Sequence, residues 1–206
     1  MTFLRTLTLT MGLSLLGALA VTATPAQAAI VTQLDFTSGS VALKSGSTTI
    51  LSSNFTQNGQ IVMGQYQPLP NVIAPIALGP YTFSIFTSDP NPFPSGSTSG
   101  ASITADLTAL SAGLTGPFLP PAPALTMNIG GNATGTFNSL TNAFTGLSWT
   151  HALSGVSGLP TGWNQYSLQF TLNGTAQLAA VPLPGAALLF LSGLSGLTLL
   201  RKRFAL

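Results

Sequence analysis

The chain has 206 residues, of which 4% are charged, and it contains no cysteine. Without cysteine there is no disulfide framework and no thiolate site. The formal net charge is +2 and the pI is about 9.4, but four of the five cations lie in the two terminal segments. Between Ala29 and Ala180, one lysine and three aspartates give a formal net charge of −2, so this part lacks the clustered cations that nucleic-acid binding needs.

Residues 1–28 have the pattern of a secretory signal peptide. Arg5 precedes an uncharged hydrophobic run over Met11–Val21, and Ala26-Gln27-Ala28 supplies the small-x-small pattern that signal peptidase cleaves. We therefore predict an N-terminal signal helix that is removed after Ala28, with Ala26 and Ala28 as the recognised residues. The new amino terminus would then lie outside the inner membrane.

The segment 29–180 alternates apolar and polar residues with a period of two, which is typical of strands with one buried and one solvated face. The clearest runs are Tyr81–Phe86, Ile103–Leu107, Leu125–Ile129 and Tyr166–Leu172. We expect about eight to ten strands. The predicted fold class is all-β: a single antiparallel β-sandwich or jelly-roll-like domain, flanked by the signal helix and by a C-terminal transmembrane helix.

Two dipeptides favour hairpin turns, Asn58-Gly59 and Asn173-Gly174. The first is expected to join a strand over Ile50–Phe55 to one over Ile61–Tyr66. One short helix over Thr104–Leu114 remains an alternative to the strand that begins there.

Three proline-rich segments are predicted to form stiff loops rather than strands, because each proline fixes φ and lacks a backbone N–H group. They cover Pro68–Pro80, Asp89–Gly100 and Pro117–Pro123. None separates two halves with many strands of their own, so we expect one domain.

The single histidine of the chain, His151, lies in an alternating run with Leu147, Trp149 and Leu153. A strand would place its imidazole near an aromatic ring, and the favoured interpretation is a partly buried histidine bonded to backbone or water. With no second histidine and no cysteine, the sequence predicts no zinc site. It contains no Gly-x-Ser-x-Gly motif, and a Ser-His-Asp triad has no positive support from spacing.

Two carboxylates could hydrolyse a glycosidic bond if their pKa values differ. Asp35, Asp89 and Asp106 are the only candidates, because the chain has no glutamate. Asp89 precedes Pro90 and is typical of a turn, while the other two fall on polar positions of their strands. We therefore predict no catalytic residue, no metal site and no cofactor, and an extracellular hydrolase remains only the third hypothesis.

Aromatic residues among many Ser, Thr, Asn and Gln residues favour carbohydrate binding mildly. Trp163 follows Gly162 in a Gly/Pro loop and is expected to be exposed, whereas most of the other candidates, Trp149, Tyr66, Tyr81 and Tyr166, are expected to have a core role. Trp163 is therefore the one candidate ligand contact in the segment 29–180.

The C-terminal segment combines a proline motif, an uncharged run over Gly185–Leu200 and the basic end Arg201-Lys202-Arg203. As a helix, its 16 uncharged residues would span about 24 Å at ~1.5 Å per residue, near the lower limit for a hydrocarbon core of about 30 Å. The three cations would stay in the cytoplasm by the positive-inside rule. The segment 29–180 would then lie on the other side of the membrane.

This arrangement resembles the PEP-CTERM sorting signal in its VPLPA-like variant, with Val181, Pro182, Leu183 and Pro184 as the motif. The resemblance covers residues 181–206. Leu183 replaces the Glu of the commonest form, and Gly185 replaces the usual Ala of the variant. The resemblance implies cleavage near the motif by an exosortase, an integral-membrane cysteine protease or transpeptidase of exopolysaccharide-making Gram-negative bacteria. An ordinary membrane anchor is the alternative.

The partners implied are signal peptidase, an exosortase, the membrane through a transient C-terminal helix, and exopolysaccharide. The protein would be exported across the inner membrane, held there with its C-terminus in the cytoplasm, and then placed at the cell surface or outside the cell. The leading hypothesis is a non-catalytic surface or matrix protein. A carbohydrate-binding module is the alternative, and it predicts Trp163 and a second aromatic residue on one exposed face.

Overall fold

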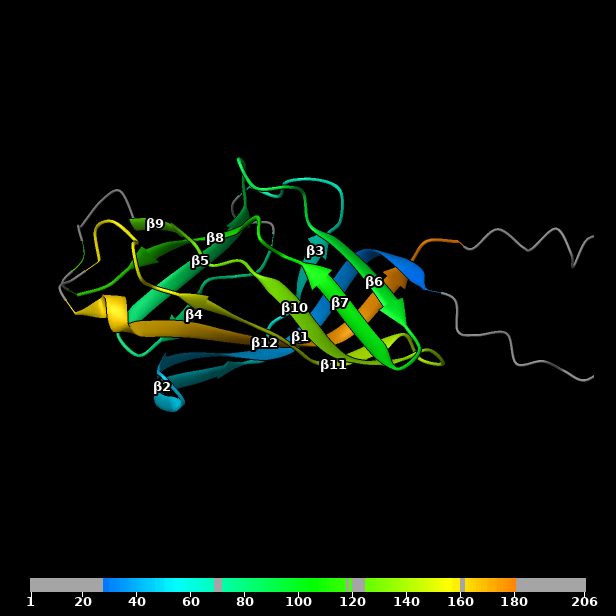
Figure 1. Ribbon diagram of the computed structural model, residues 1–206, viewed down its shortest axis with the longest axis horizontal. Helices are drawn as coiled ribbons and strands as arrows, with labels where there is room; N and C mark the ends of the chain where they lie inside the picture. The colour runs from blue at the N-terminus through cyan, green and yellow to red at the C-terminus, as the bar shows by residue number, and fades with distance from the viewer. Residues whose placement is uncertain (1–27, 69–71, 118, 120–124, 160–161, 181–206) are drawn as a thin grey trace, which may run out of the picture.

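The computed structural model describes residues 28–68, 72–117, 119, 125–159 and 162–180, which form strands and one short 3₁₀ turn (Figure 1). Twelve strands are present in this part of the chain, more than the eight to ten expected, and the all-β prediction is confirmed. In chain order the elements are β1 (Ala29–Ser45), β2 (Thr48–Phe55), β3 (Gly59–Val62), β4 (Ile76–Leu78), β5 (Tyr81–Thr87), β6 (Ser95–Ser99), β7 (Ser102–Asp106), β8 (Leu110–Thr115), β9 (Leu125–Asn128), β10 (Asn132–Asn138), β11 (Ala143–Ala152), the 3₁₀ turn η1 (Trp163–Gln165) and β12 (Tyr166–Leu178).

The first and last strands, β1 and β12, run side by side through the whole length of the described part. They pair antiparallel, from Val31 opposite Leu178 to Ser45 opposite Tyr166. The other edge of β1 pairs in succession with β6, β3 and β2. The 17-residue strand β1 is therefore hydrogen-bonded to four other strands of the large sheet.

Six strands close into a barrel in the order β1, β12, β11, β10, β7 and β6. The ring closes where Ala29 pairs with Thr98 and Ile30 pairs with Ser97. All neighbours are antiparallel, which a closed ring with an even number of strands allows. β1 contains two register shifts against β12, and such bulges bend a strand, so that its start reaches β6. The expected two-sheet sandwich or jelly roll is therefore corrected to a barrel with additional strands.

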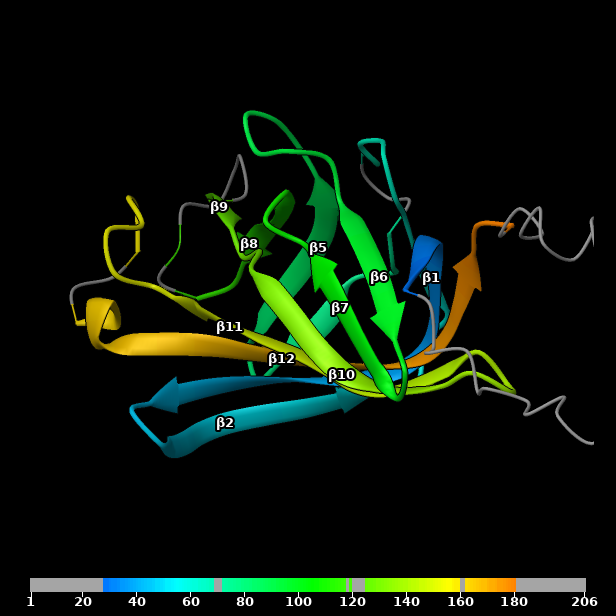
Figure 2. The same ribbon diagram turned by 45° about the vertical axis from the view of Figure 1, so that its right-hand side comes forward.

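A second sheet of four strands, in the order β4, β5, β8 and β9, lies over one part of the large sheet (Figures 1 and 2). Phe83 and Ile85 of β5 are buried, as the period of two predicted. A small apolar cavity is lined by side chains of both sheets, including Phe36 and Phe170 from the large sheet and Leu110 from the small one. The two sheets therefore share one hydrophobic core.

Neither Asn-Gly dipeptide forms a hairpin. β2 and β3 do not pair with each other, because each pairs with a different part of β1. A Cβ atom at Gly59 would lie 2.3 Å from the ring of Phe36, and a Cβ atom at Gly174, inside β12, would lie 2.0 Å from the backbone oxygen of Asp35. Both glycines serve the close approach of a neighbouring strand rather than a turn, which is the other common reason for glycine inside a strand.

Two further local predictions are wrong. Thr104–Leu114 is not a helix: β7 ends at Asp106, the N–H group of Leu110 donates to the carbonyl of Leu107 at 3.0 Å, and β8 follows. Of the segments expected as loops, residues 76–78 form β4 and residues 95–99 form β6. Both short strands contain no proline, so their N–H groups are available for pairing.

The predicted signal peptide up to residue 27, the sorting motif Val181–Pro184 and the basic end Arg201–Arg203 lie outside the described residues. In the part of the chain that the structure describes, no helical segment has the length and apolar character that a membrane crossing requires.

Candidate functional site

The two ends of the described chain leave the barrel at the same end (Figure 1). Ala28, the last residue of the predicted signal peptide, is exposed and directly precedes β1. At the other terminus, the N–H group of Ala179 donates to the carbonyl of Ile30 at 2.8 Å. The residues that lead to Val181 therefore continue directly from a strand in the middle of the sheet, with Ala180 as the one described residue beyond the last hydrogen bond.

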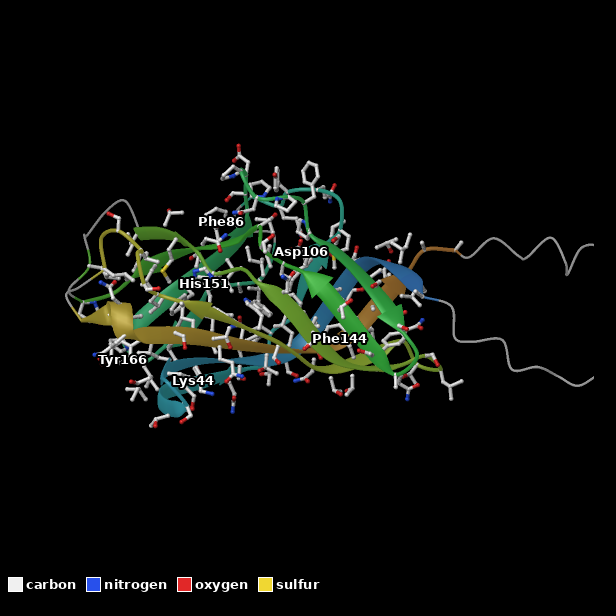
Figure 3. All side chains as sticks on the ribbon, in the orientation of Figure 1. Lys44, Phe86, Asp106, Phe144, His151 and Tyr166 are labelled. Atoms are coloured by element: carbon white, nitrogen blue, oxygen red, sulfur yellow. The ribbon has the colours of Figure 1, made fainter. Side chains whose placement is uncertain are left out.

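Tyr166 lies at the opposite end, which we term the distal end (Figure 3). Trp163, in the turn directly before it, and Tyr81, in contact with Trp163, lie there too, and all three residues are half-buried. The rings of Tyr81 and Trp163 meet edge to face, with centroids 5.2 Å apart and an interplanar angle of 81°. Tyr166 starts β12, and the ladder from Tyr166 to Leu178 covers about 40 Å at ~3.4 Å per residue. The distal end is thus separated from the chain ends by the length of the sheet.

Trp163 was expected to be exposed in a loop, but it is half-buried. It opens the 3₁₀ turn η1, after Gly162 with φ at 96°, and packs against the hydrophobic core. The sequence could not reveal its contact with Tyr81, because the two residues lie far apart in the chain. Its remaining exposed surface is adjacent to the ring of Tyr81, which is also half-buried.

The outer surface of the large sheet carries a continuous row of uncharged polar side chains, which we term the polar row. Register pairs connect its members across seven strands, and all of them are half-buried or exposed. In spatial order they are Ser97 (β6), Thr104 (β7), Thr134 (β10), Ser148 (β11), Thr171 (β12), Ser40 (β1) and Asn54 (β2). The alternation in the sequence predicted polar faces on single strands, but only the strand order aligns them in one row.

Asp35 lies on the outer face of β1 and is held by glutamine side chains, which together with it form the Asp35 cluster. Its Oδ1 accepts from Nε2 of Gln33 at 2.5 Å, and its Oδ2 accepts from Nε2 of Gln177 at 2.9 Å. The same Nε2 of Gln33 lies 3.5 Å from Oε1 of Gln60. Sequence analysis placed Asp35 on a polar face correctly but missed the three glutamines. Gln33 is two residues before Asp35 on β1, and strand pairing brings Gln60 of β3 and Gln177 of β12 to the same place.

His151 has a structural partner, in agreement with the favoured interpretation. Its Nδ1 lies 2.9 Å from the carbonyl oxygen of Gly130, so the tautomer with a proton on Nδ1 donates to that carbonyl. The neighbouring Trp149 is buried, stacks on Phe170 with centroids 5.0 Å apart, and donates from Nε1 to Ile129 at 2.8 Å. The pair of hydrogen bonds attaches β11 to the turn between β9 and β10.

The other two aspartates also have local roles. Asp106 ends β7, where its Oδ1 accepts from the N–H group of Thr108 at 3.0 Å and from the Thr108 hydroxyl at 2.7 Å. Asp89 is exposed and precedes a cis peptide bond to Pro90. Asp106, His151 and the only lysine of the described part, Lys44, occupy separate strands (Figure 3). Among the described residues, no three of His, Cys, Asp or Glu gather into a possible metal site.

Comparison with known protein families, with curated proteins and with solved structures finds no match to this chain. The functional argument therefore depends on the residues and their geometry.

Proposed function

We propose that this protein is an exported, non-catalytic component of the cell surface or extracellular matrix, which an exosortase recognises and cleaves at Val181-Pro182-Leu183-Pro184. The observation that carries the proposal is the placement of the chain ends. Ala28 and Ala180 border one continuous β domain and leave it at the same end. Processing at both borders would release the domain with its hydrogen-bonded strands intact.

The surface chemistry supports a matrix role. The polar row offers hydroxyl and carboxamide groups around the barrel, and within residues 29–180 the only charged side chains are Lys44, Asp35, Asp89 and Asp106. Hydrogen bonds from such a surface to a polymer depend little on ionic strength, because there are few charges for salt to screen. Lys44 itself donates to the Gln169 side chain at 3.0 Å.

The proposal is tested by intact mass and cell fractionation of the mature protein. We expect a mass that starts after Ala28 and lacks Arg201–Arg203, with the protein outside the inner membrane. A double variant, Pro182→Ala with Pro184→Ala, should accumulate as membrane-bound precursor, whereas a control double variant at the exposed Pro75 and Pro80 should be processed normally. A surface protein that keeps Arg201–Arg203, or normal processing without the motif prolines, would refute exosortase sorting.

A second candidate function is carbohydrate binding at the distal end. It is favoured by the edge-to-face pair of Tyr81 and Trp163, since half-exposed aromatic rings are suited to contact the apolar faces of sugar rings. Trp163→Ala should then weaken binding of the protein to the exopolysaccharide of its host, measured by co-sedimentation. If Trp163→Ala co-sediments as the wild type does, the distal end does not bind the polysaccharide.

A further inference from the structure

The Asp35 cluster combines a carboxylate with amide donors that fix its orientation. Two glutamines on different strands each donate to a different oxygen of Asp35. Each carboxylate oxygen has a further lone pair, so Asp35 can accept from additional donors without losing these bonds. Because Asp35 is only half-buried, such donors can come from a bound molecule.

The strand that carries Asp35 is irregular at this point. The register of β1 against β12 shifts between Phe36 and Ser38, which makes Thr37 an extra, unpaired residue. On the other edge of β1, pairing changes from β3 at Phe36 to β2 at Gly39. Bulges are over-represented beside binding and active sites, where they redirect a side chain. The exposed Thr37 is such a side chain.

Glycines on both neighbouring strands allow this irregular geometry. Gly59 lets β3 approach the ring of Phe36, and Gly174 lets β12 approach the backbone of Asp35. Glycine inside a strand reduces its stability relative to other residues. The two glycines therefore make β3 and β12 locally less stable on each side of Asp35.

A groove lies beside this part of β1, and we term it the Asp35 groove. It is open to solvent and has a volume of about 480 Å³, within the range of ligand sites. Its walls combine the polar side chains of Asp35, Thr37, Asn58 and Gln60 with residues 72–74, of which only Ala74 is exposed. The segment is held in place by a hydrogen bond of 2.9 Å from the N–H group of Gln60 to the carbonyl of Val72.

The chemistry of the groove selects among ligands. A metal ion would need the amide oxygens, but Gln33 and Gln177 direct their nitrogens to the carboxylate. Asp35 would repel an acidic ligand, because none of the described side chains that line the groove is a cation that could offset its charge. Vicinal hydroxyl groups fit, because they donate to a carboxylate and accept from the amide nitrogens of Asn58 and Gln60.

We propose that the Asp35 groove binds an uncharged sugar through two neighbouring hydroxyl groups, with Asp35 as their acceptor. Asn58, Gln60 and Thr37 supply further hydrogen-bonding groups, and the exposed methyl group of Ala74 contacts the apolar side of the ring. This site is separate from the distal end. It deepens the proposed matrix function by naming a ligand class, but it does not depend on exosortase processing.

The test is titration of the full chain, purified in a mild detergent, with cellohexaose, maltohexaose and mannohexaose, and with oligogalacturonate as an acidic comparison. We expect at least one neutral hexasaccharide to bind by calorimetry and the acidic one to bind more weakly. The side-chain amide NMR signals of Gln33, Gln60 and Gln177 should shift on addition of the sugar. Asp35→Asn should weaken binding about tenfold or more, since a hydrogen bond to a charged acceptor is lost.

Two milder variants keep the test valid if Asp35→Asn impairs folding. Gln60→Ala and Thr37→Val change exposed side chains and should each weaken binding about threefold to tenfold, equivalent to one neutral hydrogen bond. The matched controls Gln165→Ala and Thr150→Val, at exposed positions outside the groove, should bind as the wild type does. Sorting is scored separately by mature mass, so a failure there does not affect this result.

Three outcomes would overturn the proposal. The first is that none of the neutral hexasaccharides binds the wild-type chain. The second is that Gln60→Ala and Thr37→Val bind as tightly as their controls. The third is that Trp163→Ala abolishes binding while the groove variants retain it, which would assign the sugar to the distal end.

Discussion

The two faces of the large sheet use the same strands for different purposes. On the inner face of β12, Leu168, Phe170 and Leu172 are buried in the core that both sheets share. On the outer face, the intervening Thr171 belongs to the polar row. The buried residues of the inner face can be predicted from the hydrophobic pattern of the sequence. The alignment of polar residues into one row on the outer face depends on the strand order. Adjacent residues in one strand therefore offer matched tests of fold and of surface function.

The largest expected effect is at Phe170, which stacks on Trp149 and is 3% exposed. Phe170→Ala should lower the free energy of unfolding by about 3–5 kcal/mol, because it removes a large buried ring and leaves a cavity. Chemical denaturation followed by circular dichroism measures this change. A loss below about 1 kcal/mol would mean that the interior of the barrel does not depend on this stack.

Gly174→Ala should follow in size, with a loss of about 2–3 kcal/mol. The new Cβ atom would lie 2.0 Å from the backbone oxygen of Asp35 and 2.6 Å from the Cα atom of Phe36, so two strands must move apart. Thermal unfolding of Gly174→Ala is compared with Ser167→Ala, a half-buried position of the same strand. Equal stability of the two variants would contradict the close approach of β12 to β1.

Trp149→Phe should cost about 1–2 kcal/mol beyond the loss of apolar area. The substitution removes the hydrogen bond from Nε1 to the carbonyl of Ile129 and leaves a buried acceptor without it. The denaturation midpoint of this variant measures the loss. A stability equal to that of the wild type would show that the bond contributes nothing to the attachment of β11.

The smallest expected effect is at Thr171, on the outer face next to Phe170. Thr171→Val keeps the β-branched shape and should change the free energy of unfolding by no more than about 0.5 kcal/mol. The same denaturation assay gives the direct comparison with Phe170→Ala. A large loss here would show that the polar row supports the fold rather than a surface role.

The sequence predicted those features that depend on one strand at a time. The period of two identified β5 and β12 and their buried residues, because solvent on one face and core on the other impose that alternation. It also placed His151 correctly beside Trp149 on β11. These inferences need no knowledge of which strands are neighbours.

Features that depend on pairing were not predictable in the same way. Asn58-Gly59 and Asn173-Gly174 resemble hairpin turns by local propensity, but tertiary contacts with β1 decide their conformation. Barrel closure through Ala29 and Ile30 involves two pairs of residues far apart in the chain. In the Asp35 cluster, Gln60 of β3 and Gln177 of β12 have the same origin, since they join Gln33 and Asp35 of β1 only through strand pairing.

The position of β12 between β1 and β11 has a mechanical consequence. A force applied through the residues after Ala180 and directed along β12 acts on a strand that is hydrogen-bonded on both edges. Such a pull loads two ladders in shear, so many hydrogen bonds share the force and must break together. A terminal strand at the edge of a sheet would instead detach one bond after another. This domain is therefore attached to its C-terminal segment through the part of the sheet that is hardest to peel away.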